Sequence, residues 1–583
     1  MYVFLALLPI LLALVLMTRF RISPGKALPL SLAMTGGFGY FIWKMSLLQV
    51  LGAVLLGVLK SLDIILIIFS AVLLLNVLKK SGALKTVSGT FGHFSPDRRI
   101  QAVVIAWIFS NFIEGAAGFG AAPALAAPLL AGLGFPAFPA VMLSLVCNTL
   151  PVPFGAVGTP VLTVSSTLAP ELDKLGMPKE VFDHEMLSAL TNIFGFSGLF
   201  LPFLAVSFMI FLSGDKRRFR SMLEIFPFCF FAGAVYVIPW KLAAMFFGPE
   251  LPSILASAAA LPLIALVLKW GILTPRHVWE FPENTAGSAC PEGAGELLRT
   301  GRKENSIPDP MERNASSSFP ASSAATAEAQ TQSVDGEKMP LWKAWSPYVL
   351  IALLLMLTRL PMLPFKEILS NCCMVRLPEF FGVERTSFQW ALLNNPGIFP
   401  FLAVAVPAAW FYGMRFREMA GVFASSGKQV RLASTAIAAS FAMVQIMVFS
   451  DVNSAQIPGM LAEIAHAAAN SMGDAYLLGA PVIGVLGTFF SGSCTVSNLL
   501  FCSIQFHTAH MLHLPEALIV ALQNVGGGIG SMIRISGVVA ACATVNLSGV
   551  EGRLILLNCI PALILILLSL AGAFLFYFIP FAL

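Results

Sequence analysis

Two charged side chains lie in apolar stretches of the sequence. Glu114 interrupts the first stretch, and Arg534 is the single basic residue between Asp474 and Arg553. A charge at membrane depth costs about 2.5 kcal/mol or more, and burial favours the neutral form of a carboxyl, so Glu114 is a candidate proton carrier. Arg534 could bind a carboxylate with its planar guanidinium or pair with Glu114. The alternatives are a carboxyl that only ties helices together and an arginine that extends toward the membrane surface.

Each charge belongs to a longer apolar block that is rich in small and polar residues. The first block covers residues 101–168 and the second covers residues 477–549. Neutral donors and acceptors in such blocks can orient a hydroxy acid, although any one of them could equally form an interhelical hydrogen bond. With Glu114 as the proton carrier, the residues expected to bind substrate are Gly115, Gly118, Asn148, Thr149, Ser493, Thr495, Ser497, Asn498, Asn524 and Arg534.

The small residues in both blocks predict interrupted helices. An interruption leaves backbone N–H and C=O groups unpaired, which is tolerated at membrane depth only inside protein or beside a water-filled cavity. The amino ends of the resulting half-helices carry partial positive charge and free N–H donors, which suit a carboxylate. Close helix packing is the alternative use of glycine, but it does not explain the polar residues beside the glycines. We therefore expect a binding site for a small anion.

The two blocks have a similar pattern and run in opposite directions. Gly115 and Asn148 are 33 positions apart, and so are Ser491 and Asn524. The first block leads from a basic loop to an acidic loop, whereas the second leads from acidic to basic. This combination is typical of an inverted-topology repeat. Broken or re-entrant helices from two inverted halves are therefore expected to meet at mid-membrane.

The composition indicates the medium in which these blocks fold. Of 583 residues, 57% are hydrophobic and 11% are charged, whereas soluble domains carry about 25% charged residues. We expect an all-α integral membrane protein with about 12 to 14 transmembrane segments of about 20 residues each. The net charge of +5 is small and does not indicate nucleic acid as a partner. The lipid bilayer is the expected surrounding.

Basic residues predict the sidedness of the loops, because short cytoplasmic loops collect Lys and Arg. The basic loops are 19–26, 79–99, 216–220 and 415–431, and the acidic loops are 171–185 and 451–474. This assignment places both termini outside. Residues 46–78 form one long span or a bent pair, and single spans are expected at residues 2–18, 28–44, 186–212, 222–247, 252–270, 343–358, 391–412, 431–450 and 554–579.

A polar segment divides the chain into two parts. Residues 271–340 contain runs such as SSSFPASSAATAEAQTQS, and this composition cannot bury enough apolar surface to fold alone. The expected organisation is an N-terminal membrane half over residues 1–270, a disordered cytoplasmic linker over residues 271–340, and a C-terminal membrane half over residues 341–583.

Neither metal nor nucleotide chemistry is indicated. His507, His510 and His513 recur at every third position without a carboxylate beside them, and no cysteine pair has zinc-finger spacing. The glycines at 526–530 follow no soluble strand, and no phosphate-binding loop pattern occurs. We expect no metal and no cofactor, with a proton gradient as the driving force.

Several motifs in the two blocks resemble those of the lactate permease family. They are Glu114-Gly115-Ala116-Ala117-Gly118-Phe119-Gly120, Gly132-Leu133-Gly134-Phe135, Asn148-Thr149, Pro153-Phe154-Gly155-Ala156, Gly492-Ser493 with Thr495, Ser497 and Asn498, Gly526-Gly527, and Gly549 with Glu551-Gly552. The resemblance extends over most of the chain outside residues 271–340. It implies uptake of lactate, and commonly glycolate or related 2-hydroxy monocarboxylates, with protons across a bacterial cytoplasmic (inner) membrane.

Two positions depart from the pattern of that family. Cys494 stands where the family usually has an aspartate, and Ser531 stands where it usually has a lysine. An acid and a base are lost together, as expected for an ion pair, because removing both partners is far less destabilising than removing one. Arg534, three residues after Ser531, lies on a similar helical face and could restore part of the positive charge.

These features predict a secondary active transporter that takes up L-lactate or a related 2-hydroxy acid such as glycolate by proton symport. One alternative is a carrier of a different organic anion coupled to H⁺ or Na⁺. A membrane-embedded enzyme and a channel are disfavoured, because the two blocks contain no nucleophile–base or metal arrangement and no filter motif. The expected partners are the anion, the proton and the bilayer, and a homo-oligomer is compatible with the sequence.

Overall fold

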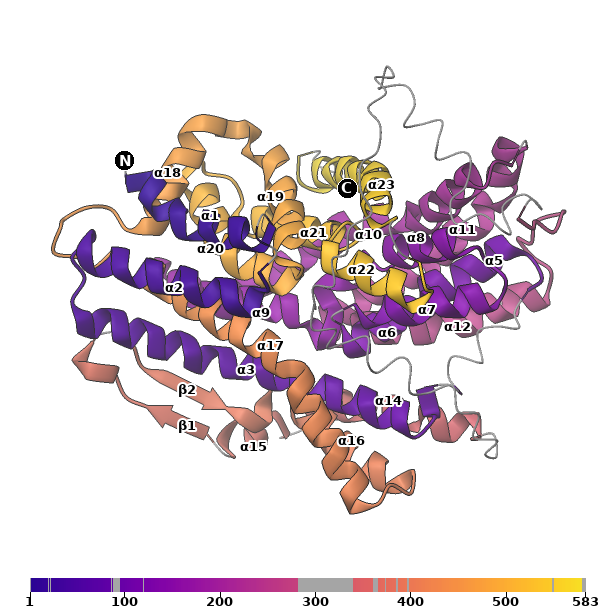
Figure 1. Cartoon of the computed structure of the whole chain (residues 1–583), viewed down its shortest axis with the longest axis horizontal. Coiled ribbons are helices and arrows are strands. Elements are labelled where there is room, and N and C mark those ends of the chain that lie inside the picture. Colours follow the sequence, from indigo (N-terminus) through magenta and orange to yellow (C-terminus); the bar gives the residue numbers. More distant parts are fainter. Residues whose placement is uncertain are drawn as a thin grey trace, which may run out of the picture.

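The computed structural model describes residues 2–578 except 19, 21, 85, 87–94, 119, 216, 282–338, 360–364, 373, 384–385, 396–397 and 548–549. Helices dominate this part of the chain, so the predicted all-α architecture is confirmed. Helices α2 (Pro24–Phe41) and α3 (Leu47–Lys80) run along the long axis of the molecule, and others cross it (Figure 1). The strands within the described residues form one antiparallel hairpin, β1 (Met374–Leu377) and β2 (Phe388–Ala391).

Seven described helical segments are long and apolar enough to cross a membrane, and the bent pair in α17 (Phe416–Phe449) makes an eighth. The two parts of α17 meet at 43°. Shorter apolar helices and helices interrupted by turns complete the path. The chain is therefore a multi-pass membrane protein.

The first half begins with three helices and continues into a helical hairpin, a broken helix and three long helices. Its elements are α1 (Tyr2–Thr18), α2 (Pro24–Phe41), α3 (Leu47–Lys80), α5 (Arg98–Ala102), the π-helix η1 (Val103–Phe109), α6 (Ser110–Ala117), α7 (Ala121–Gly132), α8 (Ala137–Cys147), η2 (Val152–Phe154), α9 (Gly155–Leu175), α10 (Lys179–Leu212), α11 (Arg218–Phe247) and α12 (Pro252–Lys269).

The first hairpin enters and leaves on one side of the molecule. Its first arm consists of α5, η1 and α6, and its second arm is α7. The guanidinium of Arg98, at the start of the first arm, donates to the carbonyl of Leu133, directly after the second arm. Both ends of the hairpin therefore lie together, which makes it a re-entrant helix pair.

The second half has the same kinds of elements. They are α14 (Leu341–Arg359), α15 (Phe365–Asn371), η4 (Phe380–Gly382), η5 (Leu392–Asn394), α16 (Phe399–Phe411), α17, α18 (Met460–Met472), η6 (Gly473–Ala475), α19 (Tyr476–Ser491), α20 (Cys494–Met511), α21 (Glu516–Gly530), α22 (Ile535–Thr544), α23 (Glu551–Ala573) and the π-helix η7 (Phe574–Phe578). Here α19 and α20 form the hairpin, and α21 with α22 forms the broken helix.

The two halves repeat one order of elements in opposite directions. A helix of 34 residues, α3 or α17, precedes each hairpin. The outer ends of α9 and α20 meet where Glu171 contacts His507, whereas α22 packs against α7 and α8 at the other end. The arms of the two hairpins therefore end on opposite sides. This arrangement is the one that an inverted topology predicts.

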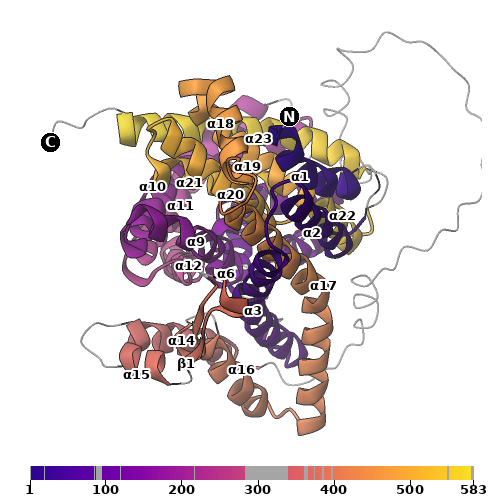
Figure 2. The same ribbon diagram turned by 90° about the vertical axis from the view of Figure 1, so that its left-hand side faces the viewer.

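The long helices α3 and α17 pack side by side (Figure 2). Gly57 lies against the backbone of Ala442, so close that a side chain at position 57 would collide with it. A capping box starts α3, because the Ser46 hydroxyl accepts from the Gln49 N–H and the Gln49 carboxamide accepts from the Ser46 N–H. This helix pair forms a support beside the hairpins and broken helices.

Two sequence expectations change in the structure. The predicted span at 391–412 is wrong at its start, because α16 begins at Phe399 and residues 388–391 pair as β2. Of the predicted linker 271–340, residues 282–338 lie outside the described part. Its beginning packs on the first half: the Trp279 indole donates to Asp215 at 3.0 Å, and the Phe281 ring contacts Phe135 with 5.2 Å between the centroids.

Candidate functional site

The tips of both hairpins depend on glycine. Gly118 and Gly120, between α6 and α7, have φ angles of 62° and 80°, in the left-handed region that glycine tolerates. Gly118 also lies against the backbone of Ala156, so a side chain there would collide with it. In the second hairpin Gly492 has a φ of 74°, and the Ser493 side chain caps α20. The first tip is therefore held against the interruption in the next helix.

The interruption before the straight part of α9 has a strained backbone. Ala156, Val157 and Gly158 have φ angles of 44°, 60° and 72°. Such a conformation costs about 1–3 kcal/mol per non-glycine residue, so the surrounding structure must hold it in place. The straight part of α9 begins at Thr159 and Pro160, and proline suits the first turn because the N–H that it lacks would have no partner within the helix. The amino end of a helix thus lies inside the protein.

The interruption in the second half lies between α21 and α22, at residues 531–534. The glycines at 526–530, which the sequence placed in a break, belong to α21. Gly526 and Gly530 lie directly against the backbone of α19, where a side chain would not fit. These glycines therefore allow close packing, and the break follows them.

The equal 33-residue spacings do not mark equivalent positions. Asn148 is the residue that follows α8 at a break, whereas Asn524 lies inside α21. The correspondence predicted from these spacings is therefore wrong, although the order of elements does repeat. Interhelical packing fixes where a glycine-rich stretch bends, and residue spacing alone does not contain this information.

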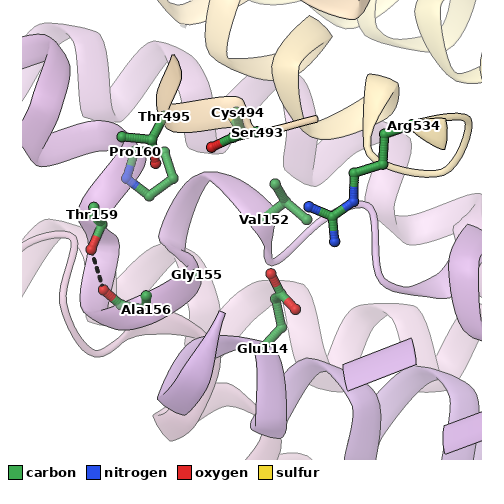
Figure 3. Close-up of a pocket in the computed structure, with 10 residues that line it drawn as sticks. All are labelled: Glu114, Val152, Gly155, Ala156, Thr159, Pro160, Ser493, Cys494, Thr495 and Arg534. Atoms are coloured by element: carbon green, nitrogen blue, oxygen red, sulfur yellow. Dashed lines mark hydrogen bonds between the residues drawn. The ribbon is translucent and has the colours of Figure 1, made fainter. Parts of the chain in front are cut away.

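The arm of the first hairpin at Glu114, the tip of the second hairpin and both interruptions line a small cavity (Figure 3). Its volume is about 30 Å³, which is room for one or two water molecules. A three-carbon hydroxy acid is larger, so the helices must separate for such a molecule to enter. The lining residues are Glu114, Val152, Gly155, Ala156, Thr159, Pro160, Ser493, Cys494, Thr495 and Arg534.

Glu114 is buried on the hairpin side of the cavity. Its carboxylate faces Arg534 and lies beside the Asn148 amide and the backbone N–H of Ala122, in the first turn of α7. One carboxylate oxygen, Oε2, has no hydrogen-bond partner among the described residues. Gly155 makes room for the carboxylate, because a side chain there would meet it. Glu114 is therefore held at a helix amino end with free capacity to bind a proton.

Arg534 extends into the cavity from the second half (Figure 3). Its Nη1 donates to the carbonyl of Gly492 at 3.2 Å, and its Nε has no partner within the described residues. The guanidinium packs on Gly120, where a side chain would displace it. Arg534 thus links the second hairpin tip to the first. Part of its donor capacity stays available for an anion.

The structure divides the predicted substrate-binding residues into two groups. Ser493, Thr495 and Arg534 line the cavity, and Asn148 lies behind Glu114. Gly118 forms the first tip. The remaining residues do not line the cavity: they are Gly115, Thr149, Ser497, Asn498 and Asn524.

Some of this second group hold the walls of the cavity together. The Asn498 amide donates to the Pro160 carbonyl at 3.1 Å and to the Asn524 side chain at 2.7 Å, which joins α9, α20 and α21. The Ser497 hydroxyl donates to the Gly484 carbonyl of α19. These contacts are interhelical hydrogen bonds of the kind that the sequence had left as an alternative.

Gly115 and Thr149 also have contacts away from the cavity. Gly115 faces Ser253 of α12 so closely that a side chain there would collide. The Thr149 hydroxyl donates to the Val146 carbonyl at 2.7 Å. Both positions therefore support the helices that surround the cavity.

Several lining residues were not in the predicted set. They are Val152, Gly155, Ala156, Thr159, Pro160 and Cys494. The sequence offered one signal for them, since Gly155 and Gly158 precede a threonine and a proline, Thr159 and Pro160, in the first block. Gly155 also packs closely, against the carboxylate of Glu114.

The two departures from the family pattern lie near each other. Cys494 opens α20, and its sulfur packs on Gly527 in the last turn of α21. Ser531 follows that helix directly and is buried, and its hydroxyl has no partner among the described residues. An acid and a base at these two positions would therefore lie close enough to interact.

The cavity presents complementary groups for a small hydroxy acid anion. A guanidinium, the amino ends of α20 and of the straight part of α9, and hydroxyls of Ser493, Thr495 and Thr159 surround the space. Helix amino ends and arginine both favour a carboxylate. Among the residues that the structure describes, no group of three or more His, Cys, Asp or Glu is placed to hold a metal ion.

Comparisons with known proteins match nearly the whole chain. The profile of a family described as L-lactate permease matches residues 3–579. A putative L-lactate permease of Haemophilus influenzae is 27% identical, with 98% of this chain and 97% of the relative aligned. An L-lactate permease and a glycolate permease of Escherichia coli K12 are each 26% identical, with 94% of this chain and 91% of the relative aligned.

Proposed function

Because this chain belongs to the L-lactate permease family, we propose that it takes up L-lactate, or a related 2-hydroxy acid such as glycolate, by proton symport across a bacterial cytoplasmic membrane. Membership in this family supports transport of lactate or glycolate, and it supports a role as a transporter over a role as an enzyme. The coupling ion, the direction of transport and the particular membrane are part of the proposal.

The observation that carries the proposal is the Glu114–Arg534 pair facing one cavity. With Glu114 ionised, the two charges neutralise each other and an anion gains little from Arg534. When Glu114 binds a proton, Arg534 becomes free to bind the substrate carboxylate. Proton and anion then favour each other's binding, which is the thermodynamic condition for symport.

The same pair keeps the charge of the site constant through the cycle. The empty site holds one negative and one positive charge. The loaded site holds a neutral Glu114, a positive Arg534 and a negative substrate, so its net charge is again zero. Neither form has to move a net charge through the low-dielectric interior, where an unpaired charge is costly.

The polar groups around the pair suit a 2-hydroxy acid. The amino end of α20, with Ser493 and Thr495, faces Arg534 across the cavity, and these groups can accept or donate to a hydroxyl beside a carboxylate. Since the cavity is smaller than the substrate, we expect the closed form described to open toward one side for entry and toward the other for release.

The test is uptake of labelled L-lactate into proteoliposomes with and without an inside-alkaline pH gradient. One pH unit is worth about 1.4 kcal/mol, so symport of one proton should give about tenfold accumulation per unit. A protonophore should remove the accumulation. Uptake that is the same with and without the pH gradient, with no alkalinisation of the outer medium, would contradict proton coupling.

A second candidate function is transport of a different organic anion, coupled to H⁺ or Na⁺. Cys494 and Ser531 favour it, because they replace an acid and a base that the family usually has, and Cys494 lines the cavity. Competition by a panel of monocarboxylates, measured with Na⁺ and with choline in its place, separates the two. Strong inhibition by an anion other than lactate and glycolate would support the second candidate.

A further inference from the structure

A row of buried threonines leads from the cavity along α9. Thr159 lines the cavity, and Thr163, Thr167 and Glu171 follow at intervals of four residues. Residues spaced in this way form one ridge of a helix. The three threonines are fully buried, and Glu171 is only 2% exposed. The ridge is therefore a polar line inside the protein that connects the cavity with the outer end of α9.

The hydroxyls on this ridge are oriented alike. Each donates to a backbone carbonyl of the preceding turn: Thr159 to Ala156 at 2.5 Å, Thr163 to Thr159 at 2.8 Å, and Thr167 to Thr163 at 2.8 Å. Each hydroxyl oxygen still has lone pairs that can accept. Four residues rise by about 6 Å along a helix, a gap that is short enough for one water molecule to span with two hydrogen bonds.

The outer end of the ridge joins a carboxylate to a histidine. Both oxygens of Glu171 are buried without a hydrogen-bond partner within the described residues. Nε2 of His507, on α20, lies 3.3 Å from one of them. The His507 side chain is 31% exposed, so it contacts the outer surface while Glu171 contacts the ridge. Histidine exchanges protons near neutral pH.

Other charged or titratable groups also surround Glu171. Lys60 of α3 and Cys502 of α20 interact with it electrostatically. On α10, Lys179 and Asp183 pair with each other at 3.6 Å. His507 is therefore the titratable group in direct contact with Glu171, and any pH dependence at this end also depends on Lys60.

We propose that His507, Glu171 and the threonine ridge of α9 form the route by which protons from the outside reach Glu114. His507 takes a proton from outer water and passes it to Glu171. Along the ridge each hydroxyl or bridging water accepts a proton on a lone pair and releases its own, until Glu114 is protonated. Only O–H and N–H bonds form and break, and this inference rests on the proposed proton symport.

The test compares two transport modes of the same proteoliposomes. Net uptake driven by a pH gradient needs a proton on every cycle, whereas exchange of internal for external lactate lets the carrier return with its proton bound. Because loss of a proton-transfer group slows a reaction by 10²–10⁴-fold in typical cases, Glu171→Gln and Thr167→Val should slow net uptake by at least about tenfold. Exchange should stay within about twofold, since the binding residues are unchanged.

Matched variants serve as controls. Thr167→Ser keeps a hydroxyl on the ridge and should restore net uptake. Glu180→Gln removes an exposed carboxylate on the same side and should change neither mode. Size-exclusion profiles of the purified variants establish that they are folded.

The outcomes separate this inference from the proposed function. If the wild-type protein moves no protons with lactate, the proposed function fails, and the route fails with it. If the wild type symports protons but Glu171→Gln and Thr167→Val keep normal net uptake, the route alone is refuted. Equal loss of net uptake and exchange in folded variants would also refute it, because that result indicates a structural role.

Discussion

In the first half, the arm of a hairpin brings a carboxyl, Glu114, to the cavity, whereas in the second half the turn of a broken helix brings a guanidinium, Arg534. The two halves share their order of elements, but the acid and the base come from different elements of the repeat. Two halves with the same order of elements therefore produce a site with an acid from one half and a base from the other. That difference is what a coupled carrier needs, because proton and anion require opposite partners.

The interruptions also differ in their backbones. The first contains the left-handed residues Ala156, Val157 and Gly158, and the tip glycine Gly118 packs against it. In the second, none of the described residues at 531–534 has a positive φ, and the turn ends with Arg534. The first half thus holds the more strained wall of the cavity, and the second supplies the positively charged side chain.

The largest expected effect comes from removing the acid. Glu114→Gln should lower the initial rate of pH-driven net uptake of lactate by at least about 100-fold, in the range typical for loss of a proton-transfer group. Exchange of lactate across the membrane should persist, because a neutral glutamine resembles the protonated carboxyl and leaves Arg534 free. The measurement is accumulation and exchange in one proteoliposome preparation. Full accumulation by this variant would show that the proton binds elsewhere.

Replacing the base should give the next largest effect. Arg534→Lys keeps the charge but loses the planar donors, and a charged hydrogen bond contributes about 1.5–3 kcal/mol. The KM for lactate should therefore rise by about 10- to 100-fold. Initial rates over a range of lactate concentrations measure it, and Arg534→Gln should be weaker still. An unchanged KM in both variants would remove Arg534 from the binding site.

The smallest effect should be on stability and should separate the strained tip from an ordinary helix position. Gly118→Ala places a side chain on a backbone with a positive φ and against Ala156. The substitution should therefore lower the free energy of unfolding by about 1–3 kcal/mol. Gly132→Ala, where a side chain meets no atom within 4 Å, is the matched control. Thermal unfolding in detergent compares them. Equal melting temperatures would mean that the tip relaxes freely.

Composition and periodicity were sufficient to predict a helical membrane architecture. An apolar chain with few charges has to satisfy its backbone hydrogen bonds internally, so helices and their approximate spans follow from residue types alone. The start of the span at 391–412 was predicted wrongly, because Ala391 ends the strand β2, which pairs with β1, and η5 precedes the start of α16 at Phe399. Such pairing depends on a partner distant in sequence.

The candidate site followed from the sequence only in part. Glu114 and Arg534 stand out because a charge in an apolar stretch is rare and needs a reason. Asn498 and Asn524 appeared equally suitable, yet the structure pairs them with each other at 2.7 Å. A polar side chain that binds substrate and one that joins helices can be the same type of residue. Only its neighbours in space distinguish them.

The sequence by itself determined that this chain is a multi-pass helical membrane protein with interrupted helices. The reason is that hydrophobicity, loop charge and helix-breaking residues act locally along the chain. Tertiary structure decided which interruptions enclose the cavity, that Glu114 faces Arg534, and that the threonines of α9 end at Glu171 and His507. These facts depend on contacts between helices far apart in sequence, where close packing at positions such as Gly118 and Gly526 fixes the geometry.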